Sequence, residues 1–158
     1  MTYKYIIDRL KAIAASHKMV KLVGYGQISD ISYPETEKAP DYPYVFINPV
    51  SVNLNTNVFS VTVNLIAMTQ VIEDSNSKVD AQDKESNILQ GQSECMQILN
   101  DILAHFQFDM TEDRDMTFSR PVSLTPFVER FQDDVVGATA TVTINYAKPM
   151  DYCNTPLS

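Results

Sequence analysis

The residues that could carry chemistry in this 158-residue chain are few and far apart. Its two histidines, His17 and His105, stand in different halves of the sequence, and Cys95 is the cysteine nearer to His105. A helix would separate Cys95 from His105 by about 15 Å, whereas a zinc site needs three or four ligands around one ion. We therefore expect structural histidines and no metal site.

The two cysteines do not indicate a nucleophile. A reactive thiol needs a neighbouring base and a lowered pKa, but Cys95 falls on an apolar helical stripe and Cys153 among the last residues. We expect both to be packed or free thiols. Two cysteines also make no disulfide framework, which is typical of a protein from a reducing compartment.

Three short patterns resemble binding motifs but lack the context that those motifs need. Residues 24–26 read Gly-Tyr-Gly without the third glycine and the following helix of a phosphate-binding loop. Residues 112–115 are acidic but have neither the glycine nor the closing glutamate of a calcium loop. Asp133 and Asp134 would form a carboxylate site only if a third group converged on them. We expect no cofactor and no catalytic residue.

Charge is distributed unevenly along the chain. The net charge is −8 and the pI is about 4.6, which argues against specific nucleic-acid binding. Residues 1–23 are nevertheless basic, with one acid, Asp8, and five cationic side chains: Lys4, Arg9, Lys11, Lys18 and Lys21. This basic segment is either a solvated helix face or a surface that docks on an acidic neighbouring subunit, with Lys4 and Lys11 as contacts.

The spacing of apolar residues predicts two helices. Residues 2–16 form an apolar stripe at helical spacing, and residues 79–107 form a longer one. The longer stripe consists of Ile88, Cys95, Leu99, Ile102 and Phe106, with Leu89, Met96 and Leu103 beside them. No run of 18 apolar residues occurs, so we expect no membrane span, and no signal peptide is apparent.

Alternating apolar and polar residues predict the strands. Their expected ranges are 19–28, 44–54, 58–70, 118–128 and 138–146. Pro49 indicates a sheet edge or a bulge. Prolines also predict a long irregular loop at about 29–43 and an extended tail at about 148–158. We expect one domain over residues 1–158 of the α+β class. Its mostly antiparallel sheet would carry the N-terminal helix and the long helix on one face.

Two groups of uncharged residues are candidates for a subunit interface. Tyr33, Tyr42 and Tyr44 flank the proline-rich loop, and tyrosine is enriched at protein interfaces. These tyrosines either contact a neighbouring subunit or cap the sheet edge of their own domain. Thr139, Thr141 and Thr143 lie on the polar face of the last strand, which suits contact with a subunit as well as with water.

The order of the expected elements resembles that of tail-terminator and head-to-tail joining proteins of tailed bacteriophages. Residues 127–137, residues 138–144 and residues 151–156 are similar to the closing part of such proteins. More loosely, the chain resembles a small neck or tail ring protein of a crAss-like phage. The resemblance extends over nearly the whole length in architecture.

The resemblance implies a structural virion protein without enzymatic activity or cofactor. Six or twelve identical subunits would form a closed ring in contact with portal, neck and tail proteins, after assembly in the host cytoplasm. DNA would pass through the lumen as cargo, and an acidic chain would repel its phosphates rather than hold them.

Two other classes stay open. A small α+β hydrolase of the hot-dog or cystatin-like type also wraps a sheet around a long helix, and Asp133, Asp134 or Glu94 would be its candidate acids. An adaptor or chaperone that binds one partner without ring symmetry is the third possibility. The stoichiometry in solution separates these alternatives from the ring.

Overall fold

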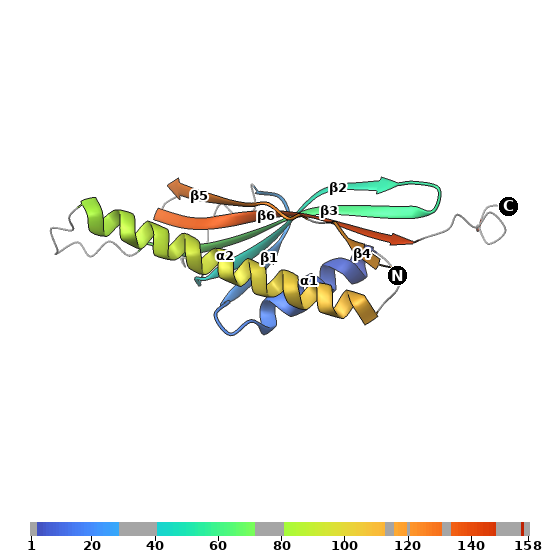
Figure 1. Cartoon of the computed structure of the whole chain (residues 1–158), viewed down its shortest axis with the longest axis horizontal. Coiled ribbons are helices and arrows are strands. Elements are labelled where there is room, and N and C mark those ends of the chain that lie inside the picture. The colour runs from blue at the N-terminus through green and yellow to red at the C-terminus, as the bar shows by residue number, and fades with distance from the viewer. Residues whose placement is uncertain are drawn as a thin grey trace.

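The computed structural model describes residues 3–28, 41–71, 81–112, 116–119, 121–130, 134–147 and 156. Two helices and six strands make up this part of the chain (Figure 1). In chain order they are α1 (Tyr3–Ser16), β1 (Leu22–Tyr25), β2 (Tyr44–Leu54), β3 (Val58–Gln70), α2 (Ala81–Glu112), β4 (Met116–Phe118), β5 (Leu124–Arg130) and β6 (Asp134–Ala147).

All six strands belong to one sheet. The main path runs β1-β2-β3-β6-β4, and β5 also pairs with β6. Strand β4 pairs with one end of β6 and β5 with the other end, so the two short strands follow one another along that side. Every pairing is antiparallel except β1 with β2. The expected α+β class with a mostly antiparallel sheet is therefore confirmed.

One face of the sheet forms the main core. Alternate residues of β3 and β6, such as Val63 and Val142, point to this face and are fully buried. Both helices pack there, because the same buried cluster contains Leu10 of α1 and Leu99 of α2. The helices thus lie on one face, as the sequence predicts, and Figure 1 shows α2 crossing the twisted sheet.

Gly91 lets α2 approach the sheet closely. A Cβ atom at this position would lie 2.6 Å from Cγ2 of Val136 and 3.1 Å from Cγ2 of Thr69. These neighbours stand near the ends of β6 and β3, so the first turns of α2 continue past the sheet. Leu89 is consequently 58% exposed, although the sequence predicts it to be part of the buried stripe.

The second face of the sheet has an apolar part and a polar part. Near one end, a smaller buried cluster comprises Tyr44, Phe46, Ile66, Met68 and Val135. Further along β3 and β6 the same face carries hydroxyl and amide side chains. Side chains therefore alternate between the two faces along β3 and β6, and the second face is apolar near one end and polar further along.

Strands β2 and β3 continue past the helices as a hairpin, which we call the arm (residues 49–58). A bulge lies between Pro49 and Ser51, and Asn55 N donates a 2.9 Å hydrogen bond to Val58 O at the turn. Every residue from 50 to 58 is exposed. In Figure 1 the hairpin extends to the right, clear of both helices. The prediction that Pro49 marks an edge or a bulge is confirmed.

Several expected boundaries were wrong. Helix α2 runs to Glu112 rather than to 107, since no glycine or proline ends it there. Strand β1 is shorter than 19–28, because residues after Tyr25 turn at Gly26, which has a φ of 147°. The expected strand over 118–128 is instead two short strands, β4 and β5, with Pro121 between them. Most of the expected loop at 29–43 and of the tail at 148–158 lies outside the described residues.

Candidate interaction surfaces

The cations of α1 contact groups of the same chain. Lys4 is exposed and forms an ion pair with Asp8 one turn later. Lys11 places its Nζ 4.9 Å from the centre of the Tyr25 ring, and Arg9 pairs with Asp109 of α2. Part of the basic segment thus holds α1 against β1 and α2, while the exposed Lys4 remains on the outer side.

The hydroxyl groups of Tyr3 and Tyr25 complete the contact between α1 and β1. Their oxygens are 2.7 Å apart. Burial and this hydrogen bond raise the pKa of Tyr3 to about 12. The phenol of Tyr3 is therefore a neutral hydrogen-bonding group at ordinary pH, which suits a structural contact between a helix and a strand.

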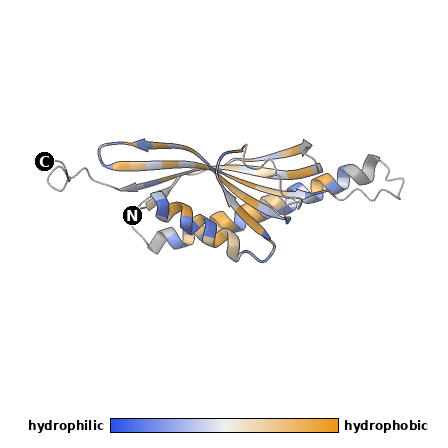
Figure 2. Cartoon of the chain, turned by 180° about the vertical axis from the view of Figure 1, so that it is seen from behind, coloured by the Kyte–Doolittle hydropathy of each residue, from blue (hydrophilic) through white to orange (hydrophobic). Residues whose placement is uncertain are grey.

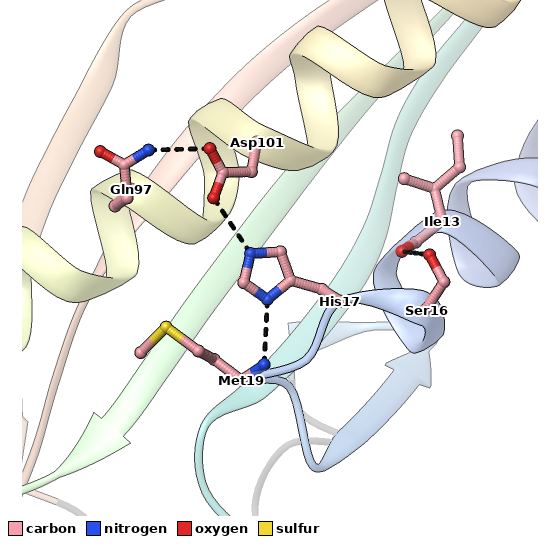
Figure 3. Close-up of polar contacts among 6 residues, drawn as sticks. All are labelled: Ile13, Ser16, His17, Met19, Gln97 and Asp101. Carbon is pink, nitrogen blue, oxygen red and sulfur yellow. Dashed lines mark hydrogen bonds and ion pairs between the residues drawn. The ribbon is translucent and has the colours of Figure 1, made fainter.

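His17 follows the last residue of α1, and both of its ring nitrogens make hydrogen bonds, one to α2 and one to the nearby backbone (Figure 3). Its Nδ1 accepts a 3.2 Å hydrogen bond from the backbone N–H of Met19, which leaves the proton on Nε2. Nε2 lies 3.1 Å from Oδ2 of Asp101, and Gln97 donates to the other oxygen at 2.7 Å. A general base needs a free nitrogen, whereas both are engaged here, so the histidine acts as a structural connection.

The three candidate tyrosines have different surroundings. Tyr44 is 9% exposed and packs edge-on against Phe46, with ring centroids 5.9 Å apart. Burial and the nearby Tyr42 raise the pKa of Tyr44. Tyr42 is half-buried and packs against the same small cluster, and Tyr33 lies outside the described residues. Tyr44 therefore caps its own sheet, which is one of the two roles that the sequence indicates.

The three candidate threonines belong to a row of polar side chains that join β3 and β6. Thr141 donates a 2.7 Å hydrogen bond to Asn64 Oδ1, and the hydroxyl oxygens of Thr143 and Thr62 are 3.2 Å apart. Thr139 lies two residues before Thr141 and is half-buried beside Ile66. The row continues with three further residues: Ser60, Asn145 and Ser119. This polar row is neutral, and Thr141 is exposed.

Two of the candidates for catalysis, Glu94 and Cys95, have described side chains, and both contact groups of their own chain. Glu94 is half-buried and accepts a 3.1 Å hydrogen bond from Gln90 on its own helix. Cys95 is fully buried, and burial together with Glu94 raises the pKa of its thiol to about 12, so it is not a nucleophile at neutral pH. Asp134 begins β6. Asp133 and Cys153 lie outside the described residues.

Metal ligands also stay apart in the part of the chain that the structure describes. No group of three His, Cys, Asp or Glu residues there could hold a metal ion. His105 Nδ1 is 3.7 Å from Asp109 Oδ2, and that carboxylate already pairs with Arg9. The arrangement is an ion-pair cluster between α1 and α2.

The arm is the most distinctive surface of the described chain, and none of the predicted candidate residues lies in it. Figure 2 shows hydrophobic residues along both strands of this hairpin. Four aliphatic side chains are exposed there: Val50 (53%), Val52 (46%), Leu54 (60%) and Val58 (38%). Among the described residues, β1 covers the outer edge of β2 only from Tyr44 to Ile47, and no strand pairs beyond it. The arm thus combines an open strand edge with exposed apolar side chains.

A signal for this surface does exist in the sequence. Residues 42–72 contain no Lys, Arg, Asp, Glu or His. Natural proteins commonly protect exposed edge strands with charges, especially lysine. A long uncharged segment predicts either a fully buried hairpin or one that another chain covers, and only the structure shows that its end is exposed.

Comparison of the sequence with models of known protein families finds no match. Comparison with curated proteins finds none either. Within the described residues, no helix is both long and apolar enough to cross a membrane.

Proposed function

We propose that this protein is a structural subunit of the neck or tail of a tailed bacteriophage, of the tail-terminator or head-to-tail joining class. Identical copies would form a closed ring of six or twelve between the portal and the tail, assembled in the host cytoplasm and retained in the virion. The element order suggests the class, and the exposed surface of the chain supports assembly.

The observation that carries the proposal is the exposed, uncharged arm. Four aliphatic side chains of this hairpin are 38% to 60% exposed, and residues 42–72 contain no charged side chain. Natural proteins commonly cover or charge such a strand edge. The arm is therefore a surface on which a neighbouring subunit could pack, as a subunit in a ring requires.

Two uncharged surfaces lie where such contacts could form. The arm carries aliphatic side chains, and the polar row around Thr141 and Thr143 carries only hydroxyl and amide groups. Depletion of charge is what distinguishes the centre of a protein interface. Both surfaces therefore suit contact with a protein neighbour.

The charge of the chain suits a protein through which DNA passes. A net charge of −8 disfavours tight contact with phosphates, which are held mainly by Lys and Arg. A lumen formed by this chain would thus let the genome move without binding it. We accordingly propose no specific nucleic-acid contact and no catalytic site or cofactor.

The test is the mass of the purified full-length protein, measured by light scattering at two concentrations and combined with electron microscopy of the particles. We expect six or twelve times 17.8 kDa and closed rings. A protein that is monomeric at both concentrations would contradict the proposal and favour the enzyme or the adaptor. A defined complex of one copy with one host protein would favour the adaptor.

A further inference from the structure

Among the described residues, no strand pairs with the outer edge of the arm, although its backbone is well suited to pairing. Asn55 donates to Val58 O, and paired residues alternate inward and outward from there. Asn53 and Ser51 consequently direct their backbone groups to β3, opposite Ser60 and Thr62. Val52 and Leu54 direct theirs to the outside, where no described strand lies.

This edge differs from the other open edge of the sheet. On that side β4 has only three residues, and β5 contains Pro126, which removes a donor, and ends in Glu129 and Arg130. Short strands, prolines and charges are the usual protection against edge pairing. In the arm, Pro49 and the adjacent bulge are features of this kind. Residues 50–54 contain neither a proline nor a charged side chain.

We propose that the outer edge of residues 50–54 pairs antiparallel with the same edge of a second copy of this chain, around a two-fold axis at Val52. In this register Val52 of one copy faces Val52 of the other. Leu54 then faces Val50, and Asn53 faces Ser51, so apolar side chains lie opposite apolar ones and polar opposite polar.

Charge favours a second copy as the occupant. Each chain carries −8, so two copies repel one another over most of their surfaces. The arm is the part where they can approach without that repulsion, because residues 42–72 have no charged side chain. A neutral edge also offers no attraction to a strongly charged partner such as DNA.

The available area is compatible with this contact. Five paired residues span about 17 Å, and the exposed aliphatic side chains of the arm flank the pairing. The contact goes beyond the proposed ring, and it fits a ring only if the subunits are even in number or if two rings meet face to face.

The test uses two substitutions at the proposed axis. In Val52→Lys and Val52→Glu, like charges would face each other across the axis, and we expect self-association at the arm to weaken by about tenfold or more. A mixture of the two variants would restore it, because lysine then faces glutamate. Thr56→Lys is the matched control: it adds the same charge at the exposed turn of the arm, outside the proposed pairing, and we expect it to associate as the wild type does.

The readout is the mass by analytical ultracentrifugation, with circular dichroism as the check that each variant folds. Wild-type assembly that neither Val52 variant weakens would overturn the arm contact and leave the proposed function standing. Loss in both variants without recovery in the mixture would overturn the two-fold arrangement. Rings that persist in the wild type but separate into smaller closed particles in Val52→Lys would support both proposals.

Discussion

Strands β2 and β3 pass through two environments, and comparing them shows what the surroundings of a strand contribute. From Tyr44 to Ile47, β2 is buried on both faces: Val45 and Ile47 lie in the main core with the helices, and Tyr44 and Phe46 lie in the smaller cluster on the second face. From residue 50 onward the same strand is exposed, although Val50, Val52 and Leu54 are apolar. Neither part contains a charged side chain. Cover from other elements therefore buries the aliphatic side chains of the first part and leaves those of the second exposed.

The same contrast separates structural from accessible groups. Among the groups covered by other elements, the thiol of Cys95 stays protonated because burial raises its pKa, and both ring nitrogens of His17 make hydrogen bonds. In the arm, every residue from 50 to 58 is exposed. Four predictions use this difference, from the largest expected effect to the smallest.

The largest difference between the covered part of the molecule and the arm should be the rate at which a thiol reacts. We expect Cys95 to react at pH 8 about a thousandfold more slowly than a cysteine placed in the arm by Ser51→Cys, because burial raises its pKa from 9.0 to about 12. Labelling both thiols in a Cys153→Ser background and locating the label by mass spectrometry measures the ratio. Equal rates in the folded protein would mean that Cys95 is not buried.

Matched leucine truncations test the energetic side of the comparison. Leu65→Ala in β3 should lower the free energy of unfolding by about 2–5 kcal/mol, because Leu65 is 1% exposed in the main core. Leu54→Ala in the arm, where the side chain is 60% exposed, should change it by about 0.5 kcal/mol or less. Urea unfolding at low protein concentration compares them without contributions from assembly. Similar losses of unfolding free energy in the two variants would contradict the distinction between a buried core and an exposed arm.

A glycine substitution tests how closely α2 approaches the sheet. Gly91→Ala should destabilise the protein by roughly 1–2 kcal/mol, since the clash with Val136 outweighs the gain in helix propensity. The double variant Gly91→Ala with Val136→Ala should recover part of this loss in a double-mutant cycle. A stabilising Gly91→Ala would show that the helix does not pack this tightly.

The smallest effect concerns the two histidines. His17→Ala should cost about 1 kcal/mol, because it removes hydrogen bonds to Asp101 and to the backbone of Met19. His105→Ala is the control: its side chain is 62% exposed and 3.7 Å from Asp109, so we expect almost no change. Thermal unfolding of the two variants measures the loss of stability. Equal losses would show that the hydrogen bonds of His17 do not stabilise the fold.

Much of the fold is predictable from the sequence because its patterns are local. The apolar stripe of α1 and the alternation in β3 and β6 identify these elements and their buried sides. Boundaries are less predictable: α2 continues past residue 107, where no sequence signal stops it. The candidate interface residues differ in exposure: Thr141 is exposed on the polar face, whereas Tyr44 is buried against Phe46, which its place beside a proline-rich loop does not indicate.

By itself, the sequence indicated where both helices and the longer strands lie, and it contains no recognisable catalytic or metal-binding motif. These properties depend on the spacing of residue types along the chain. Only the tertiary structure decided that β1 pairs parallel to β2, that His17 reaches Asp101, and that the neutral hairpin leaves its end uncovered. Each depends on which distant segments meet in space, and a local pattern does not specify that.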